Sequence, residues 1–179
     1  MQEDFFSLVL KEQEKQQAAK VLEMNPKTEK YGLTLSKEEA GQLIAAKNHT
    51  LMQQRRVEFT EGILPGLILI FCDSPYLNRG NYVETIGELQ DIFFSYKNES
   101  MDLLTDEELL HFMKEQFDGV CYGSTEYLAG TCLERFARAV RAGYRDYMEK
   151  EGEGIYEDFS EEQRWDKDLF LTVWDELIQ

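Results

Sequence analysis

Apolar residues recur along most of this chain at intervals of three or four, the spacing that collects them on one face of an α-helix. Stripes of this kind predict helices over residues 8–24, 37–56, 81–98, 106–118 and 125–151, with a last helix after Ser160. No stretch alternates apolar and polar residues as a half-buried strand does. The pattern therefore predicts an all-α fold, a single compact domain of about six or seven helices, orthogonal or bundle-like.

Several of these helices begin at side chains that can cap an α-helix. Ser36 and Thr105 each precede a glutamate by three residues, and Ser160 precedes a glutamine at the same spacing. In this capping box, the hydroxyl and the later side chain each accept a hydrogen bond from a backbone amide at the helix start. Asn81 and Ser124 are predicted to cap two further helices.

Two segments allow more than one interpretation. Residues 5–10 could open the first helix or form a short extended arm. Residues 63–72 are apolar on all sides around Pro65 and Gly66, which suits a central core helix or a buried strand. We favour a helix there, because no alternating partner strand is found elsewhere.

The chain contains no repeat and no low-complexity linker that would divide it. Residues 1–32 are expected to form an N-terminal helix or arm, 33–151 a helical core, and 152–179 an acidic linker with a C-terminal helix. A chain of 179 residues suits one domain and can bury a sizeable core.

Charge is distributed unevenly along the chain. Residues 1–90 carry 10 basic and 13 acidic side chains, a net −3, whereas residues 91–179 carry 9 and 22, a net −13. The total of −16 repels phosphate backbones, so no nucleic-acid partner is expected. The longest apolar run, residues 63–72, is shorter than the roughly 20 residues of a membrane-spanning helix, so no membrane partner is expected either.

The cysteines and the N-terminus favour a cytoplasmic location. Cys72, Cys121 and Cys132 are too few and too widely spaced for a disulfide framework or a zinc knuckle. Buried free thiols in a reducing compartment are the simpler interpretation. The first residues are acidic where a secretory signal is basic, so no export signal is expected.

Motifs for catalysis are weak. Glu108 and His111 have the E-x-x-H spacing of di-iron bundles, but no second copy accompanies them and both are predicted to face water. Cys121 could act as a nucleophile with His111 as base only within hydrogen-bond distance, which nothing in the sequence indicates. Phosphate-binding glycine loops are absent. The sequence therefore favours a protein that is not an enzyme, with no catalytic residue, metal or cofactor expected.

A basic stripe is one candidate contact surface. Arg135, Arg138, Arg141 and Arg145 occupy an arc of about 120° on the longest predicted helix, away from its apolar face. Guanidinium groups suit bidentate contacts with anions, so the stripe could receive a phosphate-bearing ligand or an acidic segment of a partner. Pairing with the surplus carboxylates of this chain is the favoured alternative.

Three further residues are candidates for contact with a ligand or partner. Tyr76 and Arg79 lie in the polar loop at residues 74–80, between predicted helices. Trp174 lies about 180° from Trp165 around the last predicted helix, so both indoles cannot face one narrow core. One of them is expected either at a surface contact or packed between two neighbouring elements.

Four short runs resemble a bacterial protein family. They are EFTEGILP at residues 58–65, FCDSPY at 71–76, YKNES at 96–100 and TDEEL at 105–109. The family is an uncharacterised one of small helical proteins with a domain of unknown function, and the resemblance covers residues 33–150. It implies a bacterial cytoplasmic helical domain and supplies no catalytic residues.

Two functions from different classes follow from these patterns. The first is a non-catalytic protein–protein interaction module that binds another protein, or a second copy of itself, through an aromatic or apolar face. The alternative is a protein or enzyme that binds a small or anionic ligand in a pocket near the loop from Ser74 to Gly80. The weak catalytic motifs and the 12% of aromatic residues favour the first.

Overall fold

The computed structural model describes residues 4–58, 61–150 and 167–178, and this part of the chain is helical without a strand. The predicted all-α fold of about six or seven helices is confirmed. Seven α-helices of the described chain have eight residues or more: α1 (Phe5–Leu22), α3 (Lys37–Gln53), α4 (Leu64–Phe71), α5 (Tyr82–Glu99), α6 (Asp106–Asp118), α8 (Leu133–Lys150) and α9 (Lys167–Ile178). The shorter elements are α2 (Asn25–Thr28), a 3₁₀ turn (Glu29–Tyr31), α7 (Thr125–Tyr127) and a π-helical turn (Leu128–Cys132).

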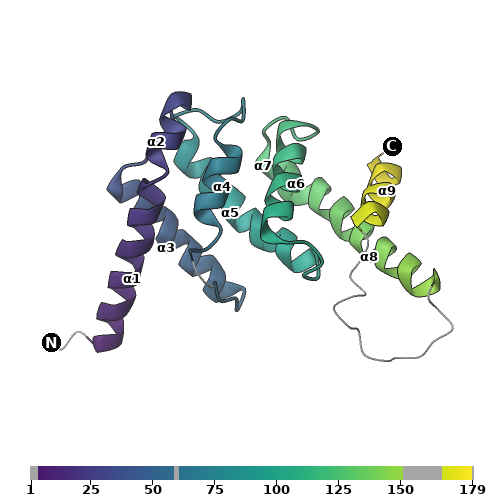
Figure 1. Ribbon diagram of the computed structural model, residues 1–179, viewed down its shortest axis with the longest axis horizontal. Coiled ribbons are helices and arrows are strands. Elements are labelled where there is room, and N and C mark those ends of the chain that lie inside the picture. Colours follow the sequence, from purple (N-terminus) through teal and green to yellow (C-terminus); the bar gives the residue numbers. More distant parts are fainter. Residues whose placement is uncertain (1–3, 59–60, 151–166, 179) are drawn as a thin grey trace.

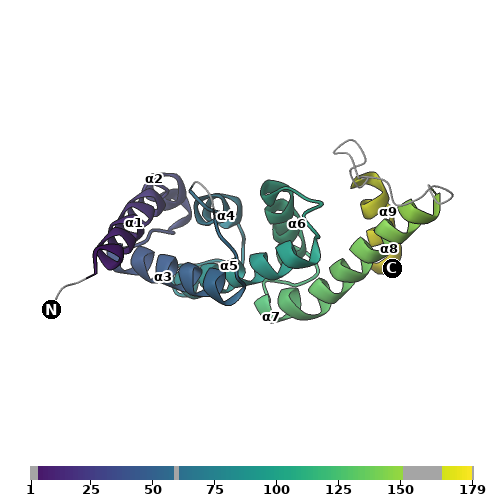
Figure 2. The same ribbon diagram turned by 90° about the horizontal axis from the view of Figure 1, so that it is seen from below.

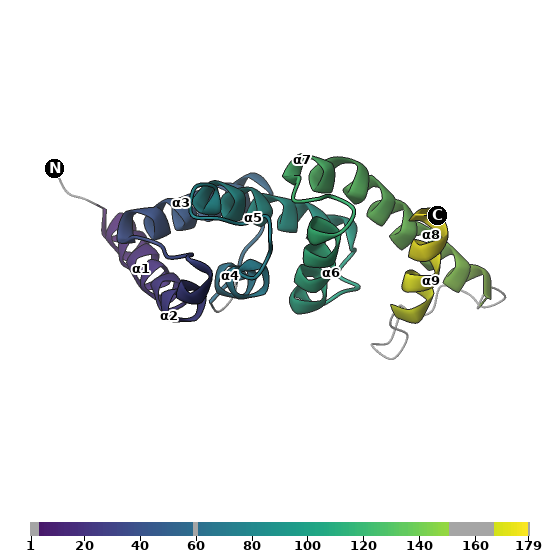
Figure 3. The same ribbon diagram turned by 90° about the horizontal axis from the view of Figure 1, so that it is seen from above.

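The helices lie in two layers that run along the long axis of the molecule. One layer contains α3, α5 and α8, and the other contains α1, α4, α6 and α9, as the views from below and above both show (Figure 2 and Figure 3). α1 lies at one end of the long axis and α9 near the other (Figure 1). α5 contacts α3, α4, α6 and α8, so it connects the two ends of the molecule.

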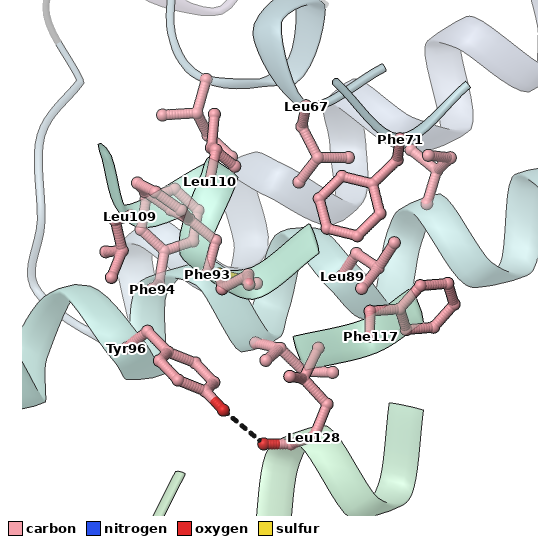
Figure 4. Packing of buried hydrophobic residues seen from close by; sticks show 14 of the residues in the cluster. Leu67, Phe71, Leu89, Phe93, Phe94, Tyr96, Leu109, Leu110, Phe117 and Leu128 are labelled. Carbon is pink, nitrogen blue, oxygen red and sulfur yellow. Dashed lines mark hydrogen bonds between the residues drawn. The ribbon is translucent and has the colours of Figure 1, made fainter. Parts of the chain in front are cut away.

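The central core fills the space between α4, α5 and α6 (Figure 4). α4 is fully buried on one face, where Leu64, Leu67, Ile68 and Phe71 are inaccessible to solvent, whereas Leu69 on the opposite side is 37% exposed. The favoured helix is therefore confirmed, with α4 flanked by Ile63 and Cys72 as its two caps. The apolar residues are not covered on all sides, because one side of α4 faces solvent.

A second group of aromatic rings joins α5 and α6 to α8 and α9. Phe112 lies 5.1 Å from Phe136 and 5.0 Å from Trp174, measured between ring centroids. Tyr96 lies 5.0 Å from Phe136, and Phe170 lies 5.8 Å from Phe112. These five rings form the aromatic cluster that fixes α9 against the rest of the described chain.

The helix starts follow the predicted capping chemistry. Ser36 and Thr105 each form the complete capping box, in which the hydroxyl and the glutamate three residues later both accept backbone amides. Ser124 accepts the amide of Tyr127. Asn81 occupies the predicted cap position, but its side chain bonds the backbone of Asn78 and Tyr76 instead. The box predicted at Ser160 lies outside the described residues.

The first helix begins earlier than its apolar stripe predicts. α1 covers Phe5–Leu22 rather than residues 8–24, so residues 5–10 are helical and not an extended arm. Pro26 lies in the first turn of α2, where its missing amide hydrogen costs nothing. Within the described ranges, no helix combines the length and apolarity that crossing a bilayer requires.

The chain is helical over residues 125–150, as predicted, but the helix is not a regular α-helix throughout. The π-helical turn Leu128–Cys132 separates α7 from α8. Buried residues follow at intervals of four from Leu128 through Cys132 and Phe136 to Val140, and on an ideal α-helix this spacing drifts by about 120° over three intervals. A π turn holds more residues and reduces the drift. Its first carbonyl accepts the Tyr96 hydroxyl at 2.8 Å (Figure 4).

Candidate functional site

Arg79, a candidate from the sequence, is engaged within the protein. Its guanidinium donates to both carboxylate oxygens of Glu39, at 2.7 and 3.0 Å. These bonds, with the backbone amide of Ser36, hold the pKa of the Glu39 carboxyl below its usual value. Since Glu39 also completes the capping box of α3, Arg79 fastens the loop at residues 74–80 to the start of that helix.

The remainder of this loop is also fixed by internal contacts. The Tyr76 ring packs edge-on against Phe117, with 6.1 Å between centroids. Gly123, at a left-handed φ of 77°, lies so close to Tyr76 that any Cβ would overlap the ring. Lys114 pairs with Asp73 at 2.9 Å and with Asp118 at 2.6 Å. Partial burial opposes its charge, but the two carboxylates outweigh that effect and raise the pKa of Lys114.

The arginine stripe of α8 is remote from this loop. Arg141 donates to Glu99, the last residue of α5, at 3.3 Å, whereas Arg79 lies just before the first residue of the same helix. An 18-residue helix separates its ends by about 25 Å. Arg135 is half-buried and Arg138 is exposed. Arg145 belongs to α8, and the structure describes its backbone but not its side chain. The structure therefore does not join the loop and the stripe in one pocket.

Trp174 is buried, with an exposed fraction of 4%. It packs at right angles to Phe112 and stacks on Phe170. Trp174 is therefore packed between neighbouring elements, which is one of the two alternatives expected from the sequence. Trp165 lies outside the described residues.

The most distinctive charged group was not predicted from the sequence. The Lys47 side chain, on α3, is 1% exposed and forms an ion pair of 2.8 Å with Glu58, which is 13% exposed. Glu58 also accepts the amide of Ile63, and Lys47 donates to Gln17 on α1. A sequence signal was available, because Lys47 falls on the same stripe as Ile44 and Leu51, where an apolar residue is expected.

A cavity of about 270 Å³ opens beside Glu58, between the end of α3, α5 and the first residue of α6. We call it the Arg56 cavity. Its apolar wall consists mostly of buried side chains, and its polar groups come from α5, from the start of α6 and from the chain after α3. The wall is formed by the buried Leu51, Ile63, Phe93 and Phe94 and by the exposed Val57, and the polar side chains are Arg56, Glu58, Lys97 and Asp106.

The charges that line the Arg56 cavity do not cancel evenly. Glu58 is neutralised by Lys47, and Asp106 is neutralised by Lys97 at 2.8 Å. Arg56 donates its Nε to the neutral amide oxygen of Asn98 at 2.7 Å. Among the described residues, Arg56 forms no ion pair, so its positive charge is the one left uncompensated at this site.

A strained residue precedes Arg56. α3 ends in a Schellman motif, in which the amide of Arg55 donates to Met52 and that of Arg56 donates to Leu51. Arg55 occupies the left-handed position of the motif, with φ of 53°. This position is usually glycine, since a Cβ there costs about 1 kcal/mol.

The variant Arg55→Gly is expected to raise the free energy of unfolding by about 0.5–1 kcal/mol, because glycine removes the strain at this position. Urea denaturation followed by circular dichroism measures the change. The control is Gln54→Gly, where φ is −89° and glycine should be neutral or destabilising. Equal or lower stability of Arg55→Gly than of the unaltered chain would contradict the assignment of strain.

A second cavity, of about 570 Å³, lies between α6 and α9. Its rim includes His111, whose Nε2 lies 3.8 Å from the Glu107 carboxylate, and its floor includes Phe112 and Phe170. Throughout the described ranges, no group of three or more histidine, cysteine or acidic side chains is arranged to hold a metal ion. Glu108 and His111 are therefore not part of such a group.

The sequence of this chain is related to that of a known protein family. Residues 20–146 match the model of a family described as a family of unknown function, DUF6323. The chain belongs to this family. No curated protein and no solved structure matches it. The match agrees with the resemblance found in the sequence, and it extends further toward the N-terminus, to the last residues of α1.

The DUF6323 region contains the Arg56 cavity and all three cysteines that the sequence placed in the interior. The Cys121 thiol donates to Cys132 at 3.7 Å, and this bond raises the pKa of Cys121. Cys121 is buried, whereas His111 is exposed and pairs with Glu107. The nucleophile and base considered from the sequence are thus engaged separately in this DUF6323 protein.

Proposed function

We propose that this protein is a non-catalytic interaction module that pairs with a second copy of itself through the first two turns of α1. The observation that carries this proposal is the exposure of five apolar side chains there. Their exposed fractions are Phe5 80%, Phe6 67%, Leu8 48%, Val9 37% and Leu10 45%. We call this group the α1 tip.

The α1 tip is apolar around most of the helix. At 100° per residue, its five apolar side chains span an arc of about 200°. A helix that is apolar over so wide an arc is normally covered by other elements. Groups of exposed apolar residues of this kind are typical of protein contact sites, whereas single exposed ones need no explanation.

The register of α1 against α3 extends this surface. Hydrogen bonds join Asn25 to Leu35 and Asn48 to Glu14, so the two helices run antiparallel. One turn further on, Leu10 is level with Met52, whose side chain is 73% exposed.

In a dimer, Phe5 and Phe6 of both copies would each bury on the order of 100 Å² of surface. Together these four side chains would supply about a third of the roughly 1,200 Å² that a stable interface buries.

Charge supports a second copy as the partner. α1 carries three lysines and two glutamates, a net +1, although the whole chain carries −16. Most of the acidic surplus belongs to residues 91–179, which include α6, α8 and α9 (Figure 1). Two copies that meet at their α1 tips would keep these acidic parts apart, so repulsion opposes pairing weakly.

Light scattering and sedimentation equilibrium test this proposal. The full chain is expected to be a dimer with a dissociation constant in the micromolar range or tighter. Replacing Phe5 and Phe6 by glutamine should weaken pairing at least about tenfold without loss of helix, because glutamine keeps helix propensity but removes apolar area.

The matched control is Tyr122→Gln, which removes an aromatic ring that is 76% exposed outside the α1 tip. This variant should remain dimeric. A chain that stays monomeric up to about 100 µM would sink the proposal. A dimer that survives unchanged in the variant with both substitutions would do the same.

We also infer a bacterial cytoplasmic location. Free thiols at Cys72, Cys121 and Cys132, all buried, support it, since secreted proteins usually oxidise such side chains.

A further inference from the structure

Independently of pairing, we propose that the Arg56 cavity binds a small monocarboxylic acid with an apolar body. In this site Arg56 receives the carboxylate, and the apolar wall of the cavity, at Val57, receives the apolar part of the ligand.

The positive charge of Arg56 is available for an anion. Its Nε is occupied by the Asn98 amide oxygen at 2.7 Å, and the described chain provides no carboxylate partner for its terminal nitrogens. A guanidinium group with two free terminal nitrogens matches the two oxygens of a carboxylate. The other cation of the lining, Lys97, is already bound to Asp106 and to the backbone oxygen of Leu104.

Two other features restrict the charge and shape of the ligand. Glu58 and Asp106 also line the cavity, so a dianion such as a phosphate monoester would meet two carboxylates for one uncompensated arginine. A monoanion matches the single charge. Val57, next to the arginine, also lines the cavity and is 75% exposed, so an apolar side chain is available to a ligand with an apolar body.

The arginine is positioned before any ligand arrives. Asn98 directs its amide oxygen to Arg56 and donates its amide nitrogen to Gln54 at 2.8 Å. The Schellman motif fixes the backbone of Arg56 through its bond to Leu51. A group that is already held in its binding geometry loses little entropy on binding, so the strain at Arg55 is consistent with a functional site.

The test uses phenylacetate as the probe, with the full chain. Its phenyl ring is small enough for a cavity of about 270 Å³, and phenylacetamide is a neutral molecule of the same shape. Titration followed by two-dimensional NMR should show saturable binding with a dissociation constant in the low-millimolar range or tighter. The shifted amides should include those of Val57 and Ile63. Phenylacetamide should bind at least about tenfold more weakly.

The variant Arg56→Gln should lose at least about tenfold in affinity for phenylacetate, whereas Arg138→Gln, which removes an exposed arginine on α8, should bind it normally. If Arg56→Gln fails to fold, Arg56→Lys replaces it, with an expected loss of at least about threefold because lysine cannot form the bidentate contact. Three results would each overturn the assignment. They are no saturable binding of phenylacetate up to about 10 mM, equal binding of phenylacetamide, and unchanged affinity in the Arg56 variant that folds.

Discussion

Glu58→Gln is expected to lower the free energy of unfolding by about 3–5 kcal/mol, the cost of removing one partner from a buried ion pair. Glutamine has the shape of glutamate and can still accept the amide of Ile63, so the substitution removes little but the charge. The Lys47 ammonium, 1% exposed, would then remain in the interior without its counter-ion. Guanidinium denaturation followed by circular dichroism measures the loss.

A double variant separates the ion pair from the packing. Lys47→Met with Glu58→Gln removes both charges and should recover most of the lost stability, since apolar replacements of buried pairs are often neutral. The exposed pair of Arg141 and Glu99 provides the matched control, and Glu99→Gln should change stability by less than about 1 kcal/mol. An effect of Glu58→Gln no larger than that of Glu99→Gln would show that water already reaches Lys47.

Phe112→Ala is expected to cost about 3 kcal/mol, the lower end for truncation of a packed phenylalanine, because part of its ring is solvent-accessible. Phe112 contacts four rings of the aromatic cluster, those of Tyr96, Phe136, Phe170 and Trp174. Its loss should therefore release α9 first. Hydrogen exchange should show faster exchange of the α9 amides than of those in α5.

His111→Ala is the control for Phe112→Ala. This neighbouring residue on α6 is exposed and pairs with Glu107 at 3.8 Å, so its replacement should change the free energy of unfolding by no more than about 0.5 kcal/mol. Uniform acceleration of exchange in α5 and α9 would contradict the idea that the aromatic cluster holds α9 separately.

Local signals in the sequence were sufficient for most of the fold. The boxes at Ser36 and Thr105 are formed by residues three apart, so the sequence alone contains both partners. The π-helical turn at Leu128 was missed because a regular α-helix also places residues four apart on roughly the same side. Its identification required the position of α5, from which Tyr96 donates to Leu128.

The candidate site depended on contacts that a sequence does not show. Arg79 was a candidate because it lies in a polar loop, but its partner Glu39 is 40 residues earlier. Arg56 was overlooked because its relevant neighbour, Asn98, is 42 residues later. Lys47 was the exception, since a lysine on an apolar stripe is visible without coordinates.

The wide turn at Leu128–Cys132 has a consequence for changes in chain length. Because a π turn contains a residue more than an α-helical turn, deletion of one residue there would restore regular α-helical geometry. The side chains on both flanks, Tyr127 before the turn and Phe136 after it, would keep their orientation. A deletion further along α8 would instead rotate every later side chain by about 100°. Relatives that differ by a single residue in length are therefore expected to place the gap in this turn.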